Sequence, residues 1–237
     1  MFEIYDSKAE VARALSGHLE RWSTEEGFRS IALSGGSTPR VWFDLLAGEY
    51  KNRLPWQEFL LFWGDERCVP PEDSQSNYGM TRKHLLDSVP VESAHVFRIR
   101  GENPPAAEAQ RYSMVLNEVL PKVHEIPQFD LVILGMGDDG HTASIFPHEM
   151  DLWGSESLCE VATHPESGQK RISLTGQVIN NAKQVVFLVT GANKAAPLAE
   201  IRNKSLVSVQ FPAAHVAPKS GRLLWLLDSA AASEKPH

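Results

Sequence analysis

The sequence has only two cysteines and no long hydrophobic run. Cys68 and Cys159 lie far apart and form no Cys-x-x-Cys pair, which is typical of a reducing compartment where thiols stay free. No apolar stretch approaches the ~20 residues that a bilayer-spanning helix needs. The first six residues lack the basic region and apolar run of a signal peptide. We therefore expect a cytoplasmic protein with no membrane partner.

A block of positive charge is also missing. The chain has 23 Lys+Arg against 30 Asp+Glu, for a formal net charge of −7. An acidic chain without a basic block is poorly suited to wrapping nucleic acid, so we expect no nucleic-acid partner. A small anionic ligand stays possible, because a few local cations and backbone amides suffice to make a positive pocket.

What is present is an ordinary globular composition, with 42% hydrophobic and 22% charged residues in 237. Apolar runs predict strands at 30–33, 59–63, 95–99, 129–134, 171–174, 185–189 and 223–227. Helical patterns lie between them, at 7–26, 39–46, 76–87, 104–120 and 195–202. Near-continuous apolar strands separated by helices predict an α/β fold, a mostly parallel sheet with helices on both faces. We expect one domain over 1–237, a monomer or weak homodimer, and a frayed tail from Ser229 after its first alanines.

Four of these strands end in loops rich in glycine and functional side chains, at 34–40, 64–70, 135–142 and 190–194. In open α/β sheets, ligands bind outside the carboxyl ends of the strands. Because these ends share one side of a parallel sheet, the four loops predict a site there.

The first two loops offer groups for an anion. Gly35, Gly36 and Ser37 precede a helix, and such a loop presents amide donors to an anion or to sugar hydroxyls. A tight turn with capping residues is the alternative. In the second loop Asp65 and Arg67 follow a buried strand. Arginine is the natural bidentate partner of phosphate; the alternative is a solvated charged turn, which is common for such triplets.

Two further cations are candidates for the same anion. Lys194 stands just past a strand end, where it is either a point charge for phosphate or an exposed lysine at a helix start. Arg171 either adds charge to the site or only flanks a strand.

His141 lies in a glycine-rich turn after the most apolar strand. A neutral imidazole there is able to take a proton from water near pH 7. A carboxylate would fix its tautomer, as in hydrolytic triads, and Asp139 and Asp65 are both candidates. The alternative is a histidine that caps the next helix.

The same turn has the Gly135-x-Gly137-x-x-Gly140 spacing of a dinucleotide fingerprint. Asp138 and Asp139 would repel a pyrophosphate there, and no acidic residue ends a clear strand about 20 positions on. Metal-ligand spacing is absent too, since His141 and His148 do not form a zincin pair. We expect no metal and no organic cofactor.

Together the loops resemble the 6-phosphogluconolactonase family, within the superfamily that includes glucosamine-6-phosphate deaminase and ribose-5-phosphate isomerase. Arg67 stands where a deaminase would have tyrosine after Asp-Glu, and the residues after His141 have the lactonase form. The matching segments occur in family order over nearly the whole chain: LSGGSTP (33–39), WGDERCVP (63–70), SNYGM (76–80), LGMGDDGHTASIFP (134–147), RISLT (171–175), GANKA (191–195) and WLLD (225–228).

The resemblance implies a Rossmann-like fold and hydrolysis of 6-phospho-D-glucono-1,5-lactone, a sugar-phosphate lactone, in the oxidative pentose phosphate pathway. His141 would act as general base and Asp139 would orient it. Arg67, Lys194 and Arg171 would hold the phosphate, and Asp65 would accept sugar hydroxyls or orient a cation. Amides around Gly35 and Gly36, or that of Gly140, would meet the oxyanion.

Two alternatives remain. One is a glucosamine-6-phosphate deaminase-like isomerase, which ammonia release would identify. The other is a non-catalytic sugar-phosphate sensor, since effector domains of some bacterial regulators share this fold. Such regulators carry a DNA-binding segment before the domain, whereas the first predicted helix here begins at residue 7.

Overall fold

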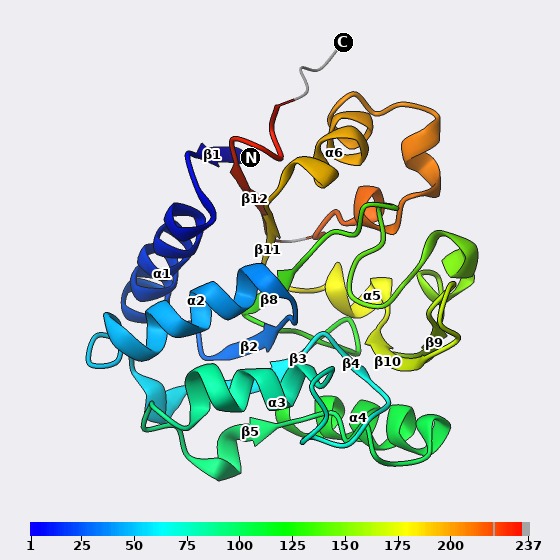
Figure 1. Cartoon of the computed structure of the whole chain (residues 1–237). Coiled ribbons are helices and arrows are strands. Elements are labelled where there is room, and N and C mark those ends of the chain that lie inside the picture. The colour runs from blue at the N-terminus through cyan, green and yellow to red at the C-terminus, as the bar shows by residue number, and fades with distance from the viewer. Residues whose placement is uncertain (220, 234–237) are drawn as a thin grey trace.

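Seven parallel strands form the central sheet of the protein (Figure 1). The structure is a computed structural model that describes residues 1–219 and 221–233. The strand order is β1-β12-β11-β8-β2-β3-β5, and each neighbouring pair is parallel. The bounds are β1 (Phe2–Tyr5), β2 (Ser30–Leu33), β3 (Leu60–Trp63), β5 (Val96–Phe97), β8 (Leu131–Leu134), β11 (Gln184–Val189) and β12 (Arg222–Asp228).

Every residue of β2, β8 and β11 is buried, as expected for strands covered on both faces. The predicted α/β fold with a mostly parallel sheet and helices is confirmed. The helices are α1 (Lys8–Glu25), α2 (Ser37–Gly48), α3 (Asn77–Thr81), α4 (Pro105–Val119), α5 (Gly176–Ile179) and α6 (Ala195–Arg202). Five of the six tryptophans are buried as expected of core residues: Trp22, Trp42, Trp56, Trp63 and Trp225.

A separate three-stranded antiparallel sheet corrects two of the predictions. It consists of β4 (Asp65–Arg67), β10 (Lys170–Leu174) and β9 (Cys159–Thr163), in that order. The predicted loop at 64–70 therefore contains a strand, and the predicted strand at 171–174 lies outside the parallel sheet. Both errors have one cause: β4 has only three residues, and its partner β10 lies about a hundred positions along the chain, beyond any local pattern.

Element boundaries differ elsewhere as well. β1, an edge strand of four residues, and the hairpin of β6 (Lys122–Val123) and β7 (Ile126–Pro127) were not predicted. The helix predicted from Pro39 begins two residues earlier, with Gly36 at its N-cap. The helix predicted at 76–87 comprises α3 and a π-helical turn, Arg82–Leu86, in which the Asp87 amide donates to the Arg82 carbonyl at 3.0 Å.

The start of the predicted frayed tail is held in place. The Ser229 amide donates to the Tyr5 carbonyl, and Ala231 is buried. Residues 234–237 lie outside the described residues.

The strand order fixes where a ligand site is expected. From the neighbours β2 and β8 the chain moves outward in opposite directions, through β3 and β5 on one side and through β11 and β12 on the other. Ligands of open α/β folds bind at such a switch point, beyond the carboxyl ends of the strands. The loops after β2 and β8, at 34–36 and 135–141, meet there.

Candidate active site

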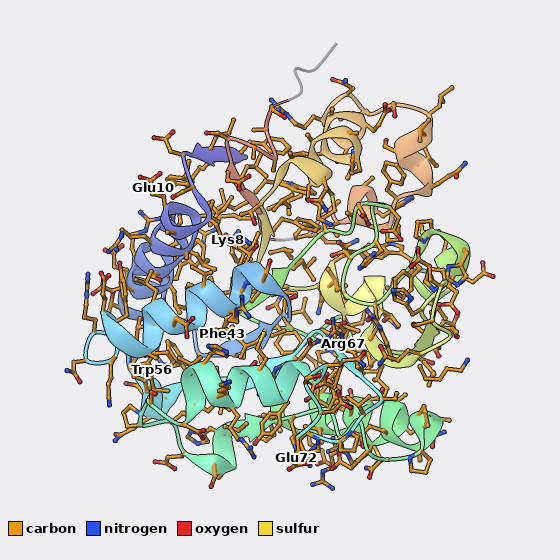
Figure 2. The ribbon with its side chains drawn as sticks, in the orientation of Figure 1. Lys8, Glu10, Phe43, Trp56, Arg67 and Glu72 are labelled. Atoms are coloured by element: carbon orange, nitrogen blue, oxygen red, sulfur yellow. The ribbon has the colours of Figure 1, made fainter. Side chains whose placement is uncertain are left out.

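A cavity of about 200 Å³ lies at this switch point. It is lined by the ends of β2 and β8, by β4 and β10 of the small sheet, and by Lys194 beyond β11. In Figure 2 Arg67 lies among the side chains between α3 and the small sheet. The cavity brings together most of the predicted site residues: Gly35, Gly36, Asp65, Arg67, His141, Arg171 and Lys194.

His141 and Asp139 form a hydrogen-bonded pair within the loop after β8. The His141 ring nitrogen Nδ1 lies 2.6 Å from Asp139 Oδ1, and the same oxygen accepts from the His141 amide at 3.0 Å. Burial raises the pKa of Asp139, but hydrogen bonds from His141 and its charge outweigh burial and lower that pKa overall. A carboxylate that binds Nδ1 fixes the tautomer and leaves Nε2 for another partner.

The backbone around this pair is specialised. A Cβ placed on Gly137 would overlap His141 Nδ1 and Asp139 Oδ1, so glycine is what allows the pair to fold over the loop. Ala143, which lines the cavity, has φ of 50°, a left-handed conformation that costs a non-glycine residue about 1–3 kcal/mol. Such strain clusters at functional sites, and here it lies two residues after His141.

Arg67 and Arg171 stand opposite each other on the adjacent strands β4 and β10 of the small sheet. They are register partners of the β4–β10 ladder, and like charges in that position repel. The Nε atoms of both are buried and have no hydrogen-bond partner within the described residues. Burial and the charge of Arg67 lower the pKa of Arg171, although Asp65 and Glu66 oppose that shift. Two guanidinium groups of like charge that line one cavity, each with an unpartnered Nε, are suited to an anion.

Asp65 is held by side chains that were not predicted as site residues. Its Oδ2 accepts a hydrogen bond from Ser144 Oγ at 2.6 Å. The side-chain nitrogen Nδ2 of Asn77 donates to the backbone carbonyl of Asp65 at 3.0 Å and lies 3.4 Å from Asp65 Oδ1. The amide of Ser144 in turn donates to Ser173 Oγ at 3.1 Å. Among the described residues Asp65 forms no hydrogen bond or ion pair with His141, whereas Asp139 is hydrogen-bonded to the imidazole.

Glu66 organises the segment behind Asp65 and was also missed. Burial raises the pKa of this carboxyl, although the amides of Tyr78, Asn77 and Arg67 donate to it at 2.7–2.8 Å and oppose the shift. It thereby fixes the start of α3, which carries Asn77. The SNYGM segment was the only sequence signal for these contacts, and nothing local connects it to residue 66.

Of the remaining predicted site residues, some line the cavity and others do not. Gly35 and Gly36 line the cavity, but Ser37 is exposed and its Oγ accepts from Lys8 Nζ at 3.0 Å. The Gly140 amide donates to the Gly137 carbonyl, so it is not a free oxyanion donor. Gly35 and Gly36 are therefore the better placed of the glycines.

The fold and this arrangement of side chains match a known family. The family model described as glucosamine-6-phosphate isomerases/6-phosphogluconolactonase covers residues 6–225, and the chain belongs to this family. The chain is 45% identical over 222 residues to 6-phosphogluconolactonase of Treponema pallidum (strain Nichols), covering 94% of this chain and 92% of that protein. The predicted recognition as a member of the lactonase group and the expectation of an enzyme are confirmed.

Solved structures agree with this assignment. A crystal structure of a devB protein has a TM-score of 0.91 at 39% identity, with 98% of this chain and 99% of that chain covered. The 6-phosphogluconolactonase from Trypanosoma brucei has a TM-score of 0.82 at 29% identity, with 98% and 97% covered. Over the described ranges, none of the helices has the length and apolarity to cross a membrane.

Proposed function

We propose that the protein hydrolyses 6-phospho-D-glucono-1,5-lactone to 6-phospho-D-gluconate, the lactone step of the oxidative pentose phosphate pathway, in the cytoplasm. The observation that carries the proposal is one cavity lined both by a carboxylate-oriented imidazole, His141, and by two guanidinium groups, Arg67 and Arg171, whose Nε atoms have no partner among the described residues. A phosphorylated ester needs both kinds of group. The family relatives named 6-phosphogluconolactonase support the same reaction.

Substrate binding begins with the phosphate. Arg67 and Arg171 supply fixed donors and Lys194 supplies a point charge to the same cavity. A phosphate dianion between them relieves the repulsion of the two guanidiniums, and charge-assisted hydrogen bonds of this kind are the strong ones. Holding the phosphate positions the carbonyl carbon C1 at the other end of the sugar next to His141, so that remote binding lowers the barrier.

The chemical step is addition of water to C1. His141 Nε2 takes a proton from water as the water oxygen bonds to C1, and the carbonyl oxygen becomes an oxyanion. The bond from C1 to the ring oxygen then breaks, and the imidazolium returns its proton to that oxygen. Asp139 stabilises the intermediate imidazolium through Nδ1. Neither cofactor nor metal takes part in this sequence.

The oxyanion requires donors on the other side of C1. The amides of Gly35 and Gly36 border the cavity and have no protein acceptor within the described residues. A single oxyanion donor is typically worth about 10²–10³ in kcat. Asp65, held by Ser144 and Asn77, presents its remaining acceptor capacity to sugar hydroxyls.

The test is acid release from freshly prepared lactone, with spontaneous hydrolysis subtracted. An enzyme-dependent rate is expected, and His141→Ala should lower kcat by about 10²–10⁴-fold, the usual worth of a positioned acid–base group. His148→Ala is the matched control, because His148 stands in the same segment but does not line the cavity. Wild-type kcat in His141→Ala would remove the base assignment. No acceleration by a folded sample would redirect the work to ammonia release from glucosamine 6-phosphate, and then to binding without turnover.

A further inference from the structure

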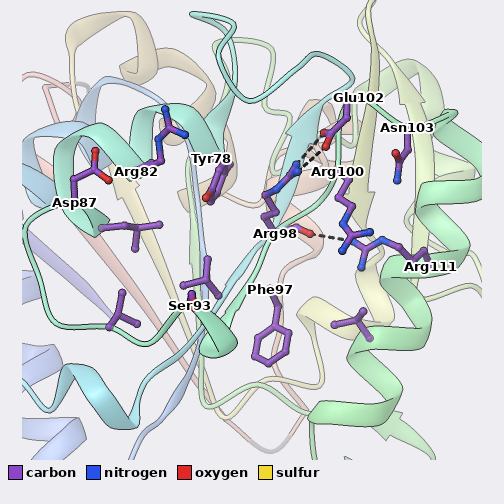
Figure 3. A pocket seen from close by; sticks show the side chains of 14 residues that line it. Tyr78, Arg82, Asp87, Ser93, Phe97, Arg98, Arg100, Glu102, Asn103 and Arg111 are labelled. Atoms are coloured by element: carbon purple, nitrogen blue, oxygen red, sulfur yellow. Dashed lines mark hydrogen bonds and ion pairs between the residues drawn. The ribbon is translucent and has the colours of Figure 1, made fainter.

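A second and larger cavity lies on the other side of α3. Its volume is about 710 Å³, within the range of small-molecule sites, and it shares no lining residue with the catalytic cavity. Four arginines border it: Arg82, Arg98, Arg100 and Arg111 (Figure 3). We call it the arginine cavity. Nothing in the proposed hydrolysis uses it.

Two of these arginines are held rigidly by acidic partners. Arg98 makes a two-bond pair with Glu102, at 2.9 and 2.5 Å, and Arg111 makes a two-bond pair with Glu108, at 2.8 and 2.5 Å. Figure 3 also shows the hydrogen bond that Arg111 donates to the Arg98 carbonyl, which is 3.0 Å long. The pairs fix two guanidinium planes at the cavity wall and leave Arg98 Nε and Arg111 Nη1 without a protein acceptor in the described part of the chain.

The other two arginines, Arg82 and Arg100, differ from this pair. Among the described residues, Arg82 and Arg100 form no ion pair, and no acceptor is bonded to either side chain. Both are exposed at the cavity rim. The cavity thus combines two preformed guanidiniums with two that are free to close on a ligand, which is an arrangement suited to a multiply charged anion.

Apolar side chains make up one part of the mixed lining of the arginine cavity, which we call its apolar floor. Leu86, Val96, Phe97 and Val115 contribute to it. Tyr78 forms part of the wall, with the Arg98 guanidinium 5.3 Å from its ring centroid. An inorganic anion alone would leave this surface uncovered and most of the volume unused. A ligand with both an apolar or flat body and a phosphate group fits the whole cavity.

We propose that the arginine cavity is a second, non-catalytic binding site for an organic phosphate whose flat body rests on the apolar floor while its phosphates meet Arg82 and Arg100. A nucleoside diphosphate has both parts and is the probe for the site. Tyr78 borders this cavity and the neighbouring Asn77 borders the catalytic one, so α3 contributes a residue to each.

The experiment is titration calorimetry of the whole protein with adenosine 5′-diphosphate, inorganic pyrophosphate and adenosine. The diphosphate is expected to bind more tightly than either part alone. The double variant Arg82→Gln/Arg100→Gln should weaken it by about tenfold or more, the usual worth of a charge-assisted contact. Both side chains are exposed and unpaired, so the variant should keep the wild-type melting temperature; Arg100→Gln alone is the reserve variant. Arg13→Gln, on the exposed face of α1, controls for loss of a surface charge.

Arg171→Gln separates the two cavities, because it weakens phosphate binding at the catalytic one only. Undiminished binding of the diphosphate to Arg171→Gln supports the proposal. Three results overturn it: no binding at millimolar probe, equal binding to the double variant, or loss of binding in Arg171→Gln, which would place the probe in the catalytic cavity. None of these results depends on lactone hydrolysis.

Discussion

Arginine side chains line both cavities beside α3, but the partners of these side chains differ. In the catalytic cavity Arg67 and Arg171 oppose each other in one β-ladder, and their buried Nε atoms have no partner within the described residues. In the arginine cavity Arg98 and Arg111 are each neutralised by a glutamate. The cavity with the imidazole is also much the smaller, at about 200 Å³ against 710 Å³. The proposed active site is therefore not the larger of the two cavities, and its arginines differ from the others in their unsatisfied buried Nε atoms.

The arginines of the two cavities also affect the stability of the ligand-free protein differently. A buried donor without a partner destabilises the ligand-free protein by about 1–3 kcal/mol, and a like-charged cross-strand pair adds to that. A site that is strained when empty and relieved by an anion uses stability to gain binding. The glutamate pairs of the arginine cavity carry no such strain, so their arginines contribute to the fold itself.

The geometry of the base gives the sharpest test of the catalytic cavity. Gly137→Ala forces a Cβ into the space of His141 Nδ1 and Asp139 Oδ1. Displacement of a catalytic group by about 1 Å typically costs about 10²-fold, so kcat should fall by about that factor. Gly135→Ala is the matched control on the same loop, because its Cβ meets nothing within 4 Å; since Gly135 lines the cavity, any effect should fall on KM. Equal kcat values for the two variants would show that the pair tolerates displacement.

The contrast between the arginines is tested by their effect on KM. Arg171→Gln removes one charge-assisted phosphate contact, worth about 1.5–3 kcal/mol or about 10–100-fold. KM for the lactone should rise by that factor, with a smaller change in kcat. Arg82→Gln, from the arginine cavity, should keep the wild-type KM. If both variants raised KM equally, long-range charge rather than contact would explain substrate binding.

The sequence predicted the strands of the parallel sheet but not the small antiparallel sheet. The buried strands of the parallel sheet were predictable, because each is a continuous apolar run such as Leu131–Leu134. The loops after them were found by their glycines and charges. The small antiparallel sheet was not found, because Arg67 and Arg171 pair at a separation that no local periodicity reveals.

The same limit applies to individual site residues. His141 and Asp139 were predictable as a pair because they are two positions apart in one loop. Asn77 and Ser144 were not, since each reaches Asp65 from a remote segment. Ser37 was predicted from its motif, yet its side chain bonds to Lys8 outside the cavity. Motif spacing identified the loops, but side-chain direction depended on the tertiary fold.

The arginine variant that impairs catalysis should not be the one that destabilises the fold. Arg111→Gln leaves the fully buried Glu108 without its guanidinium, so the free energy of unfolding should drop by about 1–3 kcal/mol, the cost of an unsatisfied buried group. Arg171→Gln removes a repulsive partner and should leave stability unchanged or raised. Urea denaturation of the ligand-free protein measures both. A larger loss for Arg171→Gln than for Arg111→Gln would contradict the idea that the empty phosphate site is strained.

The smallest expected effect concerns acid stability. Because His141 lowers the pKa of Asp139 in the folded protein against the opposing effect of burial, the ionised carboxylate stabilises the fold above its unfolded pKa, which is near 4. That contribution is lost as pH falls through the lowered folded pKa.

Asp139→Asn should therefore lose less stability between neutral and acid pH than the wild type, as measured by urea midpoints at each pH. His141→Ala should flatten the same curve, since it removes the cause of the shift, and combining the two changes should add little. Asp138→Asn, an exposed neighbour, controls for loss of one loop charge. A steeper acid dependence in Asp139→Asn than in the wild type would mean that the pair does not stabilise the fold, and that the carboxylate serves only to orient the imidazole.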